Sequence, residues 1–191
     1  IREYEPYDEM KSINWKATAK TGELKVNIRE HTAMKAVRIF LNLQDRNILR
    51  REELLEMSIS ICARLAAELT GSGVLASVYA NARDCITDRI LSLQGAAGPG
   101  GFEDICKSLA RLDLSKETED FNECFQERIF REEALYTVFI SPERHEEFQE
   151  LLAGYREKED FAWLCPVKEM EEGDIREELA GNIVKILEEK G

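Results

Sequence analysis

Seven side chains in this sequence, five cysteines and two histidines, are of the types that bind metals or take part in redox chemistry. The cysteines lie far apart and form no Cys-x-x-Cys pair: Cys62, Cys85, Cys106, Cys124 and Cys165. His31 and His145 are isolated, without a second ligand at metal-binding spacing. Apolar neighbours flank the cysteines. We therefore expect buried, reduced thiols in a reducing compartment, and neither a disulfide framework nor a zinc site.

A glycine-rich stretch and pairs of carboxylates are the other candidates for chemistry. The stretch "GAAGPGG" (95–101) could cradle a phosphate before a helix. It lacks the GK[ST] ending of a P-loop and the spacing of a dinucleotide site, so we interpret it as a connector. No GxSxG nucleophile elbow is present. Carboxylate pairs such as Glu52/Glu53 and Glu146/Glu147 fall on amphipathic helices, where a solvated face is the usual role. We predict no catalytic residues.

Alternating strands and helices must position these side chains. Apolar runs and period-two patterns predict strands over 34–43, 74–81, 85–93, 134–141 and 161–167. Helical spacing predicts helices over 50–70, 102–112, 116–130, 142–155 and 175–187. Pro142 is expected at the first position of its helix, where proline is favourable.

This order of elements predicts the fold class. Strands that alternate with helices form a mainly parallel sheet with helices on both faces. The strands 74–81 and 85–93, joined by a turn at 82–84, add one antiparallel edge hairpin. We predict one doubly wound α/β domain over 34–191, with the segment 1–33 packed on it.

Composition and charge exclude several classes of protein. The hydrophobic content is 43% and the charged content 34%, which is typical of a globular chain, and the apolar runs are too short to cross a bilayer. Residues 1–50 carry ten basic and seven acidic side chains, whereas residues 51–191 carry 16 basic and 31 acidic ones. A net charge of −12 argues against a general nucleic-acid binder. Because the chain begins at Ile1, we interpret it as part of a longer protein.

The segment "REYEPYDEMKSINWKATAKTGELKV" (2–26) resembles the signature of a bacterial domain-of-unknown-function family, number fifty-eight of that series. The matching residues are Arg2, Glu3, Tyr4, Asp8, Ile13, Trp15, Lys16, Ala19, Lys20, Gly22 and Leu24. This sequence departs from the signature at three positions: Tyr7 replaces a glycine, Met10 a proline and Lys11 an arginine. The match is specific over about 25 residues, and beyond them the resemblance rests on the order of elements.

Two interpretations of the signature stay open. Trp15, with Ile13 and Leu24, could act as a packing clamp on the domain while the neighbouring lysines stay in water. The alternative is a surface that docks a partner. We favour the clamp and expect the Trp15 ring to be buried.

The resemblance implies a fold and a partner. Members of the family combine the signature with a domain resembling von Willebrand factor type A. Relatives are often anchored in the membrane by segments upstream, with the domain in the cytoplasm, and their genes often neighbour a MoxR-type AAA+ ATPase. We accordingly expect a MoxR-type ATPase as partner and a location at the cytoplasmic face of the membrane, through an anchor outside this chain. We expect no cofactor.

Many type A domains bind a divalent cation through a metal-ion-dependent adhesion site. Its ligands are a D-x-S-x-S turn after the first strand, a threonine in a later loop and an aspartate after the fourth strand. The matching positions hold Asn42, Gln44, Arg46, Phe102 and Pro142. Hard cations require oxygen ligands, so we predict that this site binds no metal. Asp45, the one carboxylate nearby in sequence, is expected to pair with Arg46.

Two alternative functions, from different classes of protein, are compatible with these features. The first is a non-catalytic scaffold or adaptor module. The second is an enzyme, or a ligand- or nucleotide-binding domain, that uses the carboxyl ends of the strands. A flat end of the sheet capped by Arg46 and Phe102 would favour the first, and a deep pocket with perturbed carboxylates would favour the second.

Overall fold

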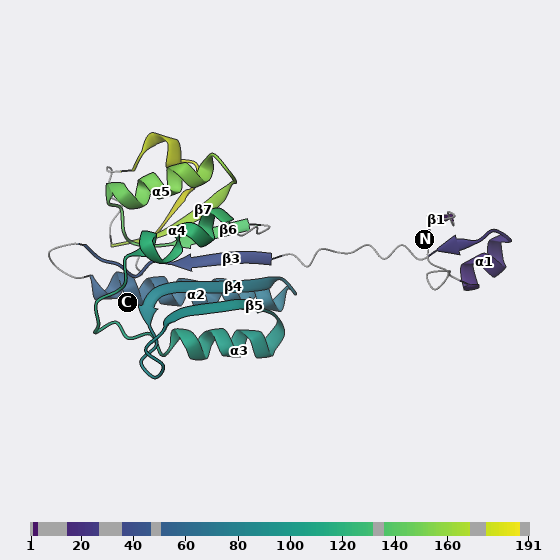
Figure 1. The fold of residues 1–191 in the computed structure, drawn as a ribbon, viewed down its shortest axis with the longest axis horizontal. Helices are drawn as coiled ribbons and strands as arrows, with labels where there is room; N and C mark the ends of the chain where they lie inside the picture. Colours follow the sequence, from purple (N-terminus) through teal and green to yellow (C-terminus); the bar gives the residue numbers. More distant parts are fainter. Residues whose placement is uncertain are drawn as a thin grey trace. The chain divides into compact units, whose positions relative to one another are not determined.

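The computed structural model describes residues 2–3, 15–26, 36–46, 51–131, 136–168 and 175–187. The chain divides into two compact units, residues 1–34 and 35–191, and each is described by itself (Figure 1). The predicted packing of the segment 1–33 on the rest of the chain stays a prediction.

The described residues of the first unit, 2–3 and 15–26, form a short helix and a two-stranded ribbon. β1 (Arg2–Glu3) pairs antiparallel with β2 (Lys25–Val26), and α1 (Trp15–Thr21) precedes β2. Gly22 ends the helix with a φ of +75°, and its N–H donates to the Thr18 carbonyl at 2.9 Å. Helices commonly end on a residue in this left-handed conformation, which glycine adopts without strain. The need for a left-handed residue at the end of α1 therefore explains the glycine at this position of the signature.

The second unit is built on a six-stranded sheet with the order β5-β4-β3-β6-β7-β8. Its strands are β3 (Ala36–Leu41), β4 (Leu75–Arg83), β5 (Ile90–Ala96), β6 (Tyr136–Ile140), β7 (Phe161–Val167) and β8 (Ile183–Leu187). Neighbouring strands run parallel, except that β4 and β5 are antiparallel. The predicted mainly parallel sheet with one antiparallel edge hairpin is confirmed (Figure 1).

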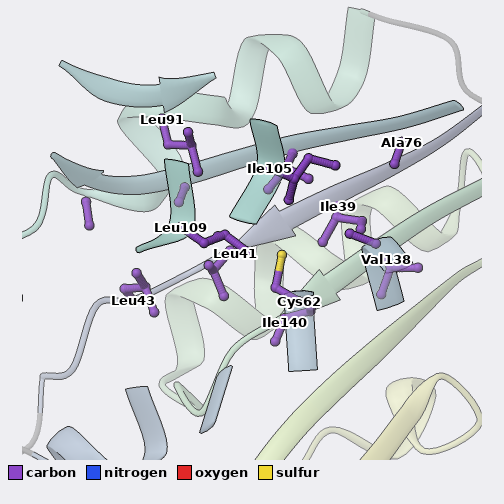
Figure 2. Close-up of a cluster of buried hydrophobic side chains, with 14 of the residues drawn as sticks. Ile39, Leu41, Leu43, Cys62, Ala76, Leu91, Ile105, Leu109, Val138 and Ile140 are labelled. Carbon is purple, nitrogen blue, oxygen red and sulfur yellow. The ribbon is translucent and has the colours of Figure 1, made fainter. Parts of the chain in front are cut away.

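Helices cover both faces of this sheet. They are α2 (Glu52–Gly71), α3 (Gly98–Leu109), α4 (Phe121–Arg131) and α5 (Glu146–Arg156). Successive side chains of a strand point to opposite faces. Ile39 and Leu41 of β3 join an aliphatic core with α2 and α3 (Figure 2), whereas Phe40 joins an aromatic core with α4 and α5. The predicted α/β class with helices on both faces is confirmed.

The hairpin and the glycine-rich stretch differ from the prediction. The turn of the hairpin lies later than 82–84, because β4 continues to Arg83 and β5 begins only at Ile90. The stretch 95–101 is not a free connector, since β5 extends to Ala96 and α3 starts at Gly98 with proline in its first turn. A Cβ on Gly101 would meet the Ala96 backbone at 2.9 Å. Glycine therefore permits this close contact between helix and strand.

The helix predicted from Pro142 begins later. α5 starts at Glu146, after an extended His145. The Glu143 side chain accepts the backbone N–H groups of Arg144 and His145 at 2.9 and 3.0 Å. These bonds hold the four residues before α5 in a non-helical turn.

The terminal helix predicted over 175–187 is wrong. The structure has a short 3-10 helix, η2 (Glu177–Leu179), followed by the edge strand β8. Asn182 separates them, because its Nδ2 donates to the Phe161 carbonyl at 2.8 Å and to Asp160 at 2.9 Å. This turn places the β-branched residues of β8 beside β7, and pairing in the sheet overrides the helical spacing.

Candidate functional site at the carboxyl ends of the strands

Polar side chains gather where the parallel strands end. They surround a cavity of about 10 Å³, which is the space of about one water molecule. The lining residues are Asn42, Gln44, Arg46, Phe121, Asn122, Glu143, His145, Glu147 and Phe148. The first three follow β3, the next two begin α4, and the others belong to the turn after β6 and the first turn of α5. Open α/β sheets place their ligands at this end.

The predicted site residue Phe102 lies elsewhere, so its assignment to the site is wrong. Ala96 at the end of β5 pairs with Ala76 near the start of β4. Helix α3 therefore begins at the opposite end of the sheet, and Phe102 lies within that helix. The segment 110–120, which leads into α4, supplies Asp120 to the site instead.

The amide oxygen of Asn42 is engaged in two hydrogen bonds. This oxygen accepts hydrogen bonds from the Gln44 backbone N–H at 3.0 Å and from the Asn81 side chain at 3.1 Å. Asn81 is itself fixed, because its oxygen accepts the Leu43 N–H at 2.8 Å. The buried Nδ2 of Asn42 has no hydrogen-bond partner within the described part of the chain. The amide oxygen of Asn42 is therefore already committed within the protein.

Arg46 provides the positive charge of the site. Its guanidinium donates to Asp120 at 2.8 Å and pairs with Glu147 on α5. Gln44 lies 3.4 Å from the same Asp120 carboxylate and accepts the Phe121 N–H at 3.4 Å. The hydrogen bond to Glu147 raises the pKa of Arg46 above its ordinary value. A guanidinium thus links the starts of α4 and α5 across the end of β3.

The pKa of Asp120 lies below its ordinary value of 3.8. Partial burial alone would raise the pKa of Asp120. Hydrogen bonds from the Glu123 backbone, Gln44 and Arg46 lower this pKa by more than burial raises it. A carboxyl group whose pKa falls on folding stabilises the protein above its unfolded pKa. That contribution disappears as the pH falls through its folded pKa.

We expect the stability difference between wild type and Asp120→Asn to be largest above about pH 5 and to shrink as the pH falls below 3.8. Asparagine keeps the ability to cap α4, so the difference reports mainly the charge. Urea unfolding at several pH values measures it, with Asp104→Asn on the exposed side of α3 as control. A difference that does not change with pH would contradict the assignment.

Asp45 pairs with a different arginine from the one predicted. Its carboxylate accepts the Arg51 backbone N–H at 2.7 Å and meets the Arg51 guanidinium at 3.2 Å, while Arg46 pairs with Asp120 and Glu147. The Arg51 guanidinium also lies 3.4 Å from the Pro142 carbonyl. Pro142 therefore contributes its backbone, and Asp45 is occupied in joining β3 to α2.

Glu143 is a site residue that the sequence analysis missed. Its buried carboxylate accepts the backbone N–H groups of Arg46, Arg144 and His145 at 3.1, 2.9 and 3.0 Å, and it contacts the His145 imidazole Nδ1. It follows Pro142 by one residue, so a carboxylate does lie beyond β6. The signal was a glutamate two residues after the predicted strand 134–141.

Asp120 is the second missed residue. Its side chain accepts the Glu123 N–H at 3.0 Å, as an N-cap residue does. An aspartate followed three residues later by a glutamate resembles a capping box, and this pattern indicates a helix that begins at Phe121 instead of residue 116. The site thus contains more carboxylates than the sequence predicted, which was Asp45 alone. No group of three or more His, Cys, Asp or Glu side chains is arranged for a metal ion within the residues that the structure describes.

The cysteines divide into two groups. Burial raises the pKa of Cys62 to about 12 and that of Cys165 to about 11, so both thiols stay protonated. Cys85 is exposed, and Cys106 and Cys124 are half-buried, which corrects the expectation that all five are buried. All five are free thiols.

The family signature is only partly described. Ala19, Lys20 and Leu24 are exposed, with Leu24 at 44%. Tyr4, Asp8 and Ile13 lie outside the described residues, as do the side chains of Arg2, Glu3, Trp15 and Lys16. The predicted burial of the Trp15 ring therefore stays a prediction.

Within the described ranges, no helix combines the length and apolar character needed to cross a membrane. Comparison of the chain with protein-family models and with curated proteins found no match.

Proposed function

We propose that residues 35–191 form a von Willebrand factor type A-like interaction module without catalytic activity, in which Arg46 replaces the divalent cation. We further propose membership of family fifty-eight and an adaptor role beside a MoxR-type AAA+ ATPase, at the cytoplasmic face of a membrane. The signature at 2–26 and the order of elements support the family. A pull-down with the full-length protein from cells, probed for a AAA+ ATPase, tests the adaptor role.

The position of the Arg46 guanidinium carries this proposal. It lies at the end of β3 between two carboxylates, Asp120 and Glu147, where it supplies one positive charge. The amide oxygen of the neighbouring Asn42 already accepts two hydrogen bonds, whereas a hard cation needs available acceptor oxygens. The carboxylates of the site are already engaged, Asp120 and Glu147 by Arg46 and the buried Glu143 by three backbone N–H groups, which supports a site without a divalent cation.

The alternative, an enzyme or nucleotide-binding domain, has less support. Ligand pockets usually have volumes of about 300–1,000 Å³, whereas this cavity measures about 10 Å³. A larger hollow of about 540 Å³ beside α5 and η2 is lined mainly by charged residues, and Arg176 in it already pairs with Glu150 and Glu178. The glycine-rich stretch belongs to α3 and β5 at the opposite end of the sheet.

We expect thermal unfolding to be unchanged by millimolar Mg²⁺ or Mn²⁺. A ligand at 100 times its dissociation constant stabilises by about 2.7 kcal/mol, which raises the melting temperature of a domain of this size by about 5–10 °C. Asp120→Asn and Asn42→Ala are the matched controls. A shift of several degrees in wild type that disappears in either variant would overturn the metal-free site.

A further inference from the structure

The side chain of Asn42 holds a buried hydrogen-bond donor that its protein neighbours do not use. Asn42 is 1% exposed, and its Nδ2 has no hydrogen-bond partner among the described residues. The donors Gln44 N–H and Asn81 Nδ2 identify the other atom of the amide as the oxygen. Buried amide groups nearly always have a partner, so this nitrogen calls for an acceptor.

Asn42 lines the small cavity at the carboxyl ends of the strands. The cavity measures about 10 Å³, the space of about one water molecule. Phe121 and Phe148 form an apolar part of its wall, with ring centroids 5.5 Å apart. The rest of the wall is polar and includes the carboxylates of Glu143 and Glu147. An unpaired donor and carboxylate acceptors therefore border the same small space.

Glu143 is the buried acceptor of this wall. Its Oε1 accepts the N–H groups of Arg144 and His145 at 2.9 and 3.0 Å, and its Oε2 accepts the Arg46 N–H at 3.1 Å. A carboxylate oxygen has two lone pairs, so Oε2 can accept a second hydrogen bond. Because Glu143 is only 2% exposed, a donor for that bond has to lie inside the protein.

The groups around the cavity favour water over other ligands. A metal ion binds acceptor oxygens and would leave the Asn42 donor unpaired. An anion could accept from Asn42, but it would lie close to the negative charge of Glu143. Water both accepts and donates, and it has the size of the cavity.

We infer that the cavity binds one ordered water molecule, which accepts a hydrogen bond from Asn42 Nδ2 and donates one to the Glu143 carboxylate. This water joins the end of β3 to the turn before α5, beside Arg46. The inference goes beyond the proposed interaction function, because it assigns a ligand that needs no partner protein.

Water–amide NOE and ROE spectra of the ¹⁵N-labelled chain test this inference. We expect cross-peaks between water and the Asn42 side-chain NH₂ that have opposite signs in the two spectra, as a long-lived bound water gives. Hydrogen exchange would give equal signs. Asn182 is the matched control, because it is also buried, at 7%, and its Nδ2 donates to Asp160 and to the Phe161 carbonyl. We expect no such cross-peaks for Asn182.

A crystal structure of the chain grown with Mn²⁺ gives an independent measurement. We expect one electron-density peak within hydrogen-bonding distance of Asn42 Nδ2 and Glu143, without anomalous signal from manganese. Asn42→Leu removes the donor at similar side-chain volume, and this variant should lose the peak. If Asn42→Leu does not fold, the wild-type spectra and density decide.

Three results would overturn the water site. A cavity without density, or an Asn42 spectrum like that of Asn182, would reject the water and leave the proposed metal-free module standing. An anomalous manganese peak in the cavity would reject both. A peak that persists in Asn42→Leu would show that the Asn42 donor does not hold the water.

Discussion

Replacement of Arg38 by methionine is expected to lower the free energy of unfolding by about 3–5 kcal/mol. Arg38 lies on β3 and is only 4% exposed, on the aromatic side of the sheet. Its guanidinium donates to Thr137 and to the Tyr155 hydroxyl, both at 3.1 Å, and to the Arg128 carbonyl at 3.1 Å near the end of α4. It also lies 5.5 Å from the centre of the Phe40 ring.

The loss is large because methionine removes the donor and leaves its acceptors in place. The carbonyl of Arg128 and the hydroxyls of Thr137 and Tyr155 would stay in the aromatic core with fewer partners. The Thr137 and Tyr155 hydroxyls keep the 2.8 Å hydrogen bond between them, so what each acceptor loses is its bond to the guanidinium, and hydrogen bonds to charged groups contribute about 1.5–3 kcal/mol each. Replacing a whole buried polar group by apolar residues can be neutral, but this substitution replaces only one member.

Urea unfolding of Arg38→Met and Arg128→Met would measure the effect. Arg128 is the matched control, because its guanidinium also lies over a ring of this core, 4.5 Å from the centre of Tyr79, but at the half-buried surface. We expect Arg128→Met to lower the free energy of unfolding by no more than about 1 kcal/mol. If the two substitutions lower this free energy equally, burial is not the reason that Arg38 stabilises the protein.

Local patterns were sufficient to predict the centre of the sheet. The run 34–43 contains β3, because a strand buried on both faces gives a nearly continuous apolar run. The helical spacing over 50–70 contains α2, because that helix buries one side and its apolar residues repeat with the helical period. Strand β8 was missed because Leu179, Ile183 and Ile186 have helical spacing. What decides their structure is Asn182, whose bonds reach residues 21 and 22 positions earlier.

The candidate site was predictable only along its first segment. Asn42, Gln44 and Arg46 follow a strand that the sequence identifies, and they line the cavity. Their partners come from distant segments, with Asp120 74 residues and Glu143 97 residues from Arg46. No local pattern encodes such pairs. Phe102 was misplaced for a related reason, because its position depends on the direction of β5.

Glu143 gives the second large expected effect. We expect Glu143→Ala to lower the free energy of unfolding by about 3–4 kcal/mol, because one buried carboxylate accepts three backbone N–H groups. Hydrogen bonds to a charged acceptor contribute about 1.5–3 kcal/mol each, and their sum is reduced because one group makes them all. Two of the donors belong to the turn before α5, and the third, from Arg46, belongs to the segment after β3.

Glu147→Ala is the matched control for this experiment. Glu147 lines the same cavity and carries the same charge, but its side chain is 65% exposed and pairs with Arg46 at the surface. We expect its removal to cost no more than about 1 kcal/mol. Glu143→Gln should fall between wild type and Glu143→Ala, because an amide oxygen can accept some of the same bonds without the charge. If Glu143→Ala and Glu147→Ala destabilise equally, the buried carboxylate does not hold the two segments together, and the rigid site around Arg46 loses its structural basis.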